Sequence, residues 1–194
     1  MNKINKLGNQ LPALILGLIF TFYSIFYFEG GGGANITLGV FAILVALTYI
    51  AVGLLPTLLK AKGHPLFMLV FVLVFPLFYF VSDLITLIAD GEYLDVVGWI
   101  MEIARMIAAL GLISFTLMAF FMKGGVVSKL QNIFLLIFAA MLVLFLIFTP
   151  YGGVRTLGNV ILADVIAYLS YLLVAFNKTA AKEDAEEQPE EEQE

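Results

Sequence analysis

The sequence contains no cysteine and only one histidine, and both shortages exclude whole classes of site. Without cysteine there are no disulfides, thiol nucleophiles, iron–sulfur clusters or thiolate zinc ligands. With His64 as the only imidazole, a multi-histidine metal site is excluded as well. We therefore expect no metal and no cofactor. No combination of residues typical of a catalytic site is present, so we expect the protein not to be an enzyme.

Charged residues are also scarce, at 13% of the chain, whereas 62% of the residues are hydrophobic and the mean hydropathy is +1.03. A soluble domain has roughly a quarter charged residues and under half apolar ones. A chain of 194 residues has too little interior for this many apolar side chains, so we expect the lipid bilayer to surround most of them. The sequence has no basic patch, which excludes a nucleic-acid partner.

Six apolar segments follow one another, each close to the ~20 residues that cross the hydrocarbon core of a bilayer. They cover residues 11–28, 36–59, 65–89, 93–121, 130–149 and 157–176. Glycine-rich or proline-containing turns separate them, beginning with the four glycines at 30–33. Short loops between long helices imply antiparallel neighbours. The pattern predicts an all-α membrane domain over residues 1–178, with six transmembrane helices in three antiparallel hairpins.

The distribution of lysine indicates how the helices are oriented. If six segments cross the membrane, all eight lysines fall on one side, and Arg155 is the only basic residue on the other side. These lysines are Lys3, Lys6, Lys60, Lys62, Lys123, Lys129, Lys178 and Lys182. By the positive-inside rule both termini are cytoplasmic and the protein lies in the inner or plasma membrane. Residues 179–194 are strongly acidic and predict a disordered cytoplasmic tail.

The first and last predicted hairpins share a pattern, in which a glycine turn leads into a Thr-Leu-Gly helix start. The matching residues of the last hairpin are Pro150, Gly152, Gly153, Thr156, Leu157 and Gly158, and those of the first are Gly32, Gly33, Thr37, Leu38 and Gly39. With six helices in so short a chain, this pattern resembles the HdeD-type acid-resistance membrane proteins of bacteria. The middle hairpin, which carries the acids, departs from that family. The resemblance implies a stress-linked inner-membrane protein.

Four charged residues lie at membrane depth within the predicted segments, namely Asp83, Glu102, Arg105 and Asp164. Such residues are costly at membrane depth, so each is a candidate functional residue. Tyr79 lies four residues before Asp83, Arg105 three after Glu102, and Tyr168 four after Asp164. These spacings place each pair on one face of its helix. We expect the three polar faces to meet inside the bundle.

Three further acids lie where the third and fourth segments meet: Asp90 and Glu92 between them, and Asp95 at the start of the fourth. They predict an acidic rim at the outer end of the bundle. Trp99 is expected to lie about two turns below this rim and to pack against neighbouring helices.

The polar cluster has three interpretations. The first and favoured one is that it holds the helices together, since polar contacts between membrane helices contribute ~0.6–2 kcal/mol each. The second is a proton or cation site, because three carboxylates exceed one guanidinium by two negative charges, and burial then favours protonation or a bound cation. The third is a face for lipid or for a partner protein.

These interpretations lead to different functions. The sequence predicts a small, non-enzymatic multi-pass inner-membrane protein that acts in acid or envelope stress. One alternative is a transporter or channel for protons, cations or a small solute. Another is a membrane subunit of a larger complex, with a second copy or another membrane protein as its partner.

Overall fold

The computed structural model describes residues 10–58, 65–122, 125–148 and 161–175. Its elements in chain order are α2 (Gln10–Gly30), α3 (Gly32–Leu58), α4 (Pro65–Ala89), the short 3-10 helix η1 (Gly91–Tyr93), α5 (Val96–Phe121) and α6 (Gly125–Phe148), followed by a helix at Ile161–Ala175 that we call the C-terminal helix. The described residues form no strand, which confirms the all-α class.

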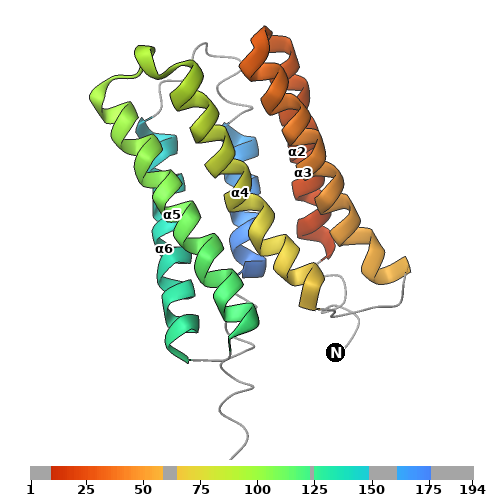
Figure 1. Cartoon of the computed structure of the whole chain (residues 1–194). Helices are drawn as coiled ribbons and strands as arrows, with labels where there is room; N and C mark the ends of the chain where they lie inside the picture. The colour runs from red at the N-terminus through yellow and green to blue at the C-terminus, as the bar shows by residue number, and fades with distance from the viewer. Residues whose placement is uncertain (1–9, 59–64, 123–124, 149–160, 176–194) are drawn as a thin grey trace, which may run out of the picture.

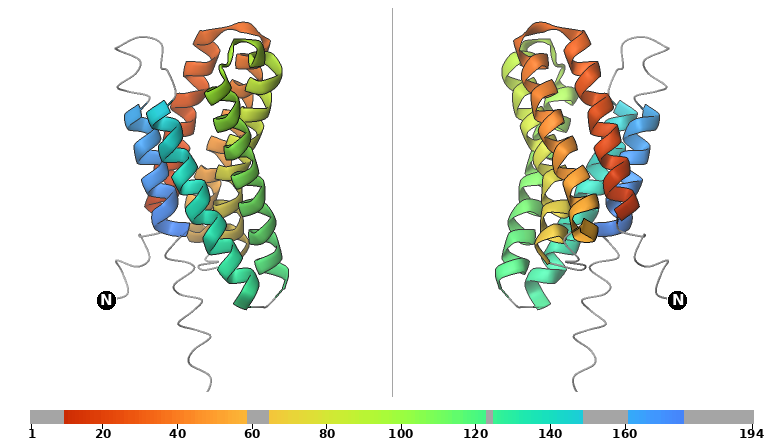
Figure 2. Two further views of the ribbon diagram at one scale, coloured as in Figure 1. Left: turned by 90° about the vertical axis from the view of Figure 1, so that its left-hand side faces the viewer. Right: turned by 90° about the vertical axis from the view of Figure 1, so that its right-hand side faces the viewer.

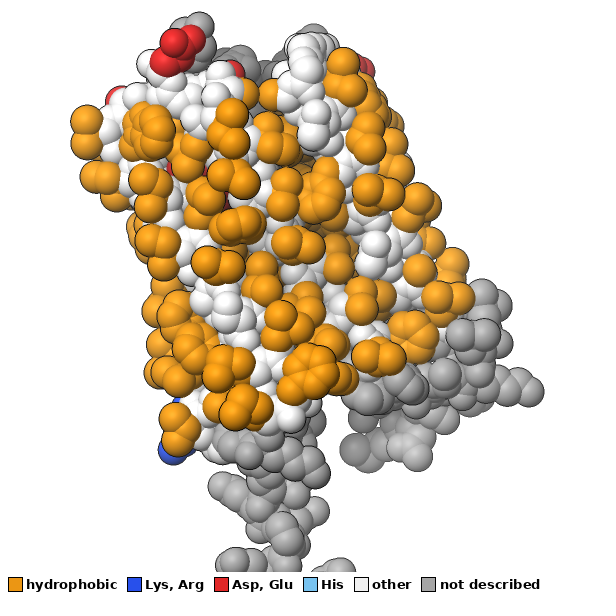
Figure 3. Space-filling view, in the orientation of Figure 1, with side chains coloured by type: hydrophobic (Ala, Val, Ile, Leu, Met, Phe, Trp, Pro, Cys, Tyr) orange, Lys and Arg blue, Asp and Glu red, His pale blue; other side chains and the backbone are white. Residues whose placement is uncertain are grey.

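Five of these helices, α2 to α6, are long and apolar enough to cross a membrane, and the described part of the C-terminal helix is shorter. Large apolar side chains point outward along the bundle, including Leu18 and Ile107, which are 69% and 62% exposed. Figure 3 shows hydrophobic side chains over the whole visible flank, with charged side chains near its two ends. Such a surface is unfavourable in water and is compatible with a multi-pass membrane protein.

Consecutive helices run in opposite directions along the bundle (Figure 1). Each helix from α2 to α6 packs against the next one in the chain. The C-terminal helix lies beside α2 and α6 in both views of Figure 2. We call the upper end of the bundle in Figure 1 the η1 end, because it carries η1 and also the turn between α2 and α3.

Several helix boundaries differ from the expected ones. The start of α3 at Gly32 is four residues earlier than expected, because only Gly31 interrupts the helical path. Gly31 and Gly32 have φ values of 65° and 78°, a left-handed conformation that glycine adopts at little cost. Two residues with positive φ therefore make the turn for which a four-glycine loop was expected. The start of α6 at residue 125 is five residues early, and that of α5 at residue 96 is three residues late.

Much of the evidence for orientation lies outside the described residues. Of the eight lysines, only Lys129 on α6 is described. Arg155, the glycine turn and Thr-Leu-Gly start at 150–158, and the acidic tail at 179–194 also fall outside. The cytoplasmic location of both termini and the likeness of the first and last hairpins therefore stay predictions.

An aromatic cluster forms the core and joins four helices. Phe75 of α4 is fully buried at its centre. Its ring stacks on Tyr171 of the C-terminal helix at 4.4 Å between centroids, and it meets Phe20 of α2 and Phe138 of α6 edge-on at 6.0 and 6.4 Å. Both geometries are favourable for aromatic pairs. This cluster fixes α4 in the middle of the bundle, where its polar residues also lie.

Pro76 lies inside α4 without ending the helix. Proline has no N–H group, so the carbonyl four residues earlier, that of Val72, lacks its usual helical donor. The hydroxyl of Tyr171 donates to this oxygen at 3.1 Å, and the hydroxyl of Tyr49 on α3 donates to the adjacent carbonyl of Phe71 at 3.1 Å. Side chains of neighbouring helices thus satisfy the backbone around the proline, as an apolar surrounding requires.

Candidate functional site

An ion-paired group of three residues lies between α4 and α5, and we call Asp83, Arg105 and Glu102 the triad. Arg105 Nε donates to Asp83 Oδ2 at 2.8 Å, and Arg105 Nη2 donates to Asp83 Oδ1. The same Nη2 also donates to Glu102 Oε2 at 3.3 Å. All three residues are buried, with at most 6% of their surface exposed. Two carboxyl groups therefore share one nitrogen of a single guanidinium.

The position of each residue along its helix explains why the triad forms. Asp83 lies six residues before the end of α4, and Glu102 lies six residues after the start of α5. At 1.5 Å per residue, both are ~9 Å from the η1 end. Arg105 is one turn deeper, but side chains lean toward the start of their helix. The Arg105 side chain of α5 therefore leans back to the level of the two carboxyl groups.

Aromatic rings surround the remaining part of the guanidinium. Its central carbon lies 3.4 Å from the ring centroid of Phe145 on α6 and 5.2 Å from that of Tyr79 on α4. Among the described residues, Nη1 of Arg105 is buried without a hydrogen-bond partner. The negatively polarised ring faces compensate for the missing acceptor through cation–π attraction.

Asp164 is placed next to the triad by tyrosines. Its carboxylate accepts a hydrogen bond from the hydroxyl of Tyr23 on α2. The hydroxyl of Tyr79 is close enough to Asp164 to interact with its charge. The ring of Tyr79 also contacts that of Tyr168 at 5.7 Å between centroids. Because Tyr79 faces Arg105 as well, the six residues of the expected cluster form one connected region of the bundle.

The expected acidic rim lies on the connection between α4 and α5, and one of its members has a structural role. Asp95 caps the start of α5, where its Oδ1 accepts a hydrogen bond from the N–H of Gly98 at 2.7 Å. Asp90 and Glu92 are exposed at this end of the bundle. The expected depth of Trp99 is wrong: because α5 starts late, the residue lies in the first turn, and its indole N–H donates to the carbonyl of Gly91 at 2.9 Å.

Sequence reasoning missed two residues that contact this region, namely Tyr23 and Phe145. Tyr23 and Tyr27 are four residues apart on α2, so they share a face, and that spacing was an available signal. Phe145 carries no comparable signal, because it is one of eighteen phenylalanines.

The triad has an unbalanced charge. If both carboxyl groups are ionised, two negative charges face one positive charge. Among the described residues the only other basic side chain is that of Lys129, near the opposite end of the bundle. A net charge in a weakly polar interior is costly, and one added proton removes it. The described residues contain no group of three or more side chains arranged to hold a metal ion.

Comparison of the chain with protein-family models, curated proteins and solved structures gives no match. The likeness to the HdeD-type proteins therefore stays a prediction. The function has to be argued from the bundle and its buried charges.

Proposed function

We propose that the chain is a small multi-pass protein of the inner membrane, with six spans in three hairpins and both termini in the cytoplasm. The five long apolar helices and the apolar flank support the spans. The distribution of lysine supports the orientation.

The cysteine-free chain makes this topology straightforward to test. Glu92→Cys at the η1 end and Lys129→Cys at the start of α6 each introduce one exposed thiol. A membrane-impermeant thiol reagent added to intact cells should label only the first variant, and both variants after lysis. Labelling of Lys129→Cys in intact cells would reverse the proposed orientation.

We further propose that the protein is not an enzyme and that its function, in acid or envelope stress, depends on proton uptake by the triad. The observation that carries this proposal is the sharing of Arg105 Nη2 by Asp83 and Glu102. Acidification supplies the proton that neutralises the triad. A neutral triad changes the contacts between α4 and α5, which gives the bundle a response to external acid. The resemblance to acid-resistance proteins supports the same interpretation.

Infrared difference spectroscopy of the protein in lipid nanodiscs tests proton uptake. On acidification, wild type should develop the carbonyl band of a protonated buried carboxyl group, and Glu102→Gln should lose that band. Asp95→Asn is the matched control, because it changes a carboxylate that only caps a helix. The proposal fails if the band is absent from wild type or is unchanged in Glu102→Gln.

A second candidate function is transport of protons, cations or a small solute. It is favoured by the placement of three carboxyl groups, Asp83, Glu102 and Asp164, in the half of the bundle nearest the η1 end. Flux into proteoliposomes should be compared for wild type, Glu102→Gln and Asp164→Asn. Conduction by wild type, with loss in variants that fold normally, would establish transport.

The helix-holding role predicts a different result for the same variants. Wild type would not conduct at any pH tested, and Glu102→Gln would only unfold at a lower temperature. Replacing Arg105 by methionine as well would lower the unfolding temperature further, because Asp83 would then be buried without its partner.

A further inference from the structure

Arg105 binds the two carboxyl groups of the triad very unequally. Asp83 accepts two hydrogen bonds, one from Nε at 2.8 Å and one from Nη2, so the guanidinium meets its carboxylate side-on. Glu102 accepts one, from Nη2 at 3.3 Å, which is longer than a usual N–H···O bond. Bidentate pairs between charged groups are among the strongest hydrogen bonds in proteins. The ionised form is therefore better stabilised at Asp83 than at Glu102.

The ring of Phe145 on α6 lies flat against the guanidinium. Its centroid is 3.4 Å from Cζ of Arg105, which is about the contact distance of two carbon atoms. Cζ must then lie over the face of the ring, because an approach to the ring edge would place the centroid farther away. A cation over an aromatic face is attracted to it, most strongly where water is excluded. A shift of the guanidinium toward Glu102 would draw it off this ring.

The remaining nitrogen of the guanidinium shows that such a constraint is needed. Among the described residues Nη1 of Arg105 is buried without a hydrogen-bond partner. Glu102, three residues earlier on the same helix, receives only one long bond. An unused donor and a poorly bound acceptor thus lie side by side, and a guanidinium that could turn freely would bring them together. Contact with Phe145 is the interaction that opposes this turn.

We propose that Glu102 is the carboxyl group of the triad that takes up the proton, and that Phe145 is the positioning residue that keeps Arg105 on Asp83. The proposal rests on proton uptake by the triad as proposed above. On acidification the Glu102 carboxylate accepts one proton from water and becomes a neutral carboxyl group. Asp83 and Arg105 keep their charges and remain a neutral pair. Phe145 thereby determines the pH at which the triad responds.

The other charged and titratable groups around Glu102 come from α2, α4, α5 and the C-terminal helix. They are Tyr23 and Tyr27 of α2, Tyr79 and Asp83 of α4, Arg105 of α5, and Asp164 and Tyr168 of the C-terminal helix. The described part of α6 contributes Phe145, and its one charged residue, Lys129, lies near the opposite end of the bundle. Arg105 is the one positive charge in this set, so its position decides which carboxylate is stabilised.

Isotope labelling identifies the proton acceptor without any substitution. Full-length protein in lipid nanodiscs is prepared with carbon-13 in the side-chain carboxyl group of glutamate, or of aspartate, and is then acidified. The heavier carbon lowers the frequency of a carbonyl band. We expect the infrared band of the buried carboxyl group to move in glutamate-labelled protein and to stay in aspartate-labelled protein. A band that moves only with the aspartate label overturns the assignment to Glu102.

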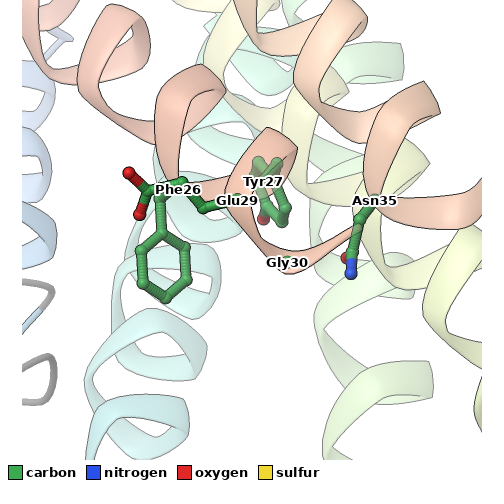
Figure 4. Close-up of a pocket in the computed structure, with 5 residues that line it drawn as sticks. All are labelled: Phe26, Tyr27, Glu29, Gly30 and Asn35. Carbon is green, nitrogen blue, oxygen red and sulfur yellow. The ribbon is translucent and has the colours of Figure 1, made fainter. Parts of the chain in front are cut away.

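Two other described glutamates, Glu29 and Glu92, are exposed and should not contribute to the band of a buried group. Figure 4 shows Glu29 among the residues that line a pocket of about 300 Å³ beside the turn between α2 and α3. Glu29→Gln is therefore the matched control for Glu102→Gln. The first variant should keep the glutamate band and the second should lose it. Loss of the band in Glu29→Gln alone would also overturn the assignment.

The role of Phe145 is tested by the pH at which half of the band has appeared. Phe145→Leu removes the ring face and frees Arg105 to bind Glu102 more closely, which stabilises the Glu102 carboxylate. We expect the midpoint of this variant to lie about one pH unit below that of wild type, as for loss of a cation–π contact shielded from water. Phe145→Tyr keeps the ring face and should keep the wild-type midpoint.

Phe134→Leu is the matched control on the same helix. The ring of Phe134 packs against Phe115 and Gly111 of α5, away from the triad. This variant should unfold at a lower temperature and keep the wild-type midpoint. The role of Phe145 is refuted if the midpoint of Phe145→Leu equals or exceeds that of wild type, or if Phe134→Leu shifts it equally.

The two proposals fail in different ways. If wild type shows no carboxyl band, proton uptake is refuted, and the present inference is refuted with it. If wild type shows the band but the glutamate label or Phe145→Leu leaves it unchanged, proton uptake stands, and only the assignment to Glu102 or the role of Phe145 is refuted.

Discussion

The hydrogen bond from Tyr171 to the carbonyl of Val72 gives a sharp test of the packing around α4. Tyr171→Phe keeps the ring that stacks on Phe75 and removes only the hydroxyl. Because Pro76 provides no N–H, the Val72 oxygen then has no helical donor to replace the lost one. Tyr171 is fully buried and Val72 is 3% exposed, so we expect no water at this oxygen.

The expected loss follows from the cost of an unsatisfied buried carbonyl. A typical hydrogen bond contributes about 0.5–1.5 kcal/mol net, whereas a buried group left without a partner costs about 1–3 kcal/mol. Measured hydrogen bonds between membrane helices lie at the lower end of this range. We therefore expect Tyr171→Phe to lower the free energy of unfolding by about 1–2 kcal/mol.

Pro76→Ala changes this expectation in a defined way. Alanine restores an N–H four residues after Val72, and that group takes over the free oxygen. With alanine at position 76, Tyr171→Phe should lower the free energy of unfolding by under about 0.5 kcal/mol. The coupling energy between Pro76→Ala and Tyr171→Phe should therefore be about 1 kcal/mol. Reversible unfolding in mixed detergent micelles measures all four members of the cycle.

Tyr49→Phe is the internal control for this cycle. Its acceptor, the carbonyl of Phe71, has the N–H of Phe75 as a second donor four residues later. Its cost should therefore be the same with proline or alanine at position 76. If Tyr171→Phe is equally costly in both backgrounds, the proline does not create the need for the tyrosine, and the reasoning is wrong.

Two further predictions concern helix contacts and helix starts. A Cβ atom at Gly111 would overlap the ring of Phe134, so Gly111→Ala should lower the free energy of unfolding by about 1–3 kcal/mol. Gly125→Ala, where nothing lies within 4 Å, should leave the packing unchanged in the same thermal unfolding assay. Asp95→Ala removes the cap on the N–H of Gly98 and should cost about 1 kcal/mol, whereas Asp95→Asn should retain most of the stability. An equal loss in both Asp95 variants would show that charge, rather than capping, matters there.

The helices were predictable because membrane helices are defined mainly by length and apolarity. Residues 65–89 form an apolar run that begins with Pro65 and contains Asp83 as its only charged residue, and α4 covers the same range. The residues at which the helices begin were less predictable, because a polar or glycine-rich stretch is typical of a loop. Gly32 and Gly125 nevertheless begin helices. Gly32 is the second of the two residues with positive φ that form the turn before α3, and Gly125 starts α6 five residues before the predicted start.

The site was predictable where its contacts are local to one helix. Glu102 and Arg105 are three residues apart, and this spacing alone brings them together. The pairing of Arg105 with Asp83 also depends on the relative height of α4 and α5. That height is set by the connection through η1 and the cap at Asp95, which makes the two residues equally distant from the end of the bundle. Asp95, which the sequence predicts as part of an acidic rim, therefore also helps to set the relative height of α4 and α5 on which the triad depends.

The tyrosines were undervalued because sequence reasoning at membrane depth counts charges, and a phenol has none. Tyr23 nevertheless donates to Asp164, and Tyr171 donates to the Val72 carbonyl that Pro76 leaves without a helical donor. In an apolar surrounding a buried hydroxyl without a hydrogen-bond partner is costly, although less so than an unpaired charge. The hydroxyls of Tyr23 and Tyr171 each pair with a polar atom on a neighbouring helix, and the pair of Tyr23 with Asp164 brings α2 and the C-terminal helix into the site.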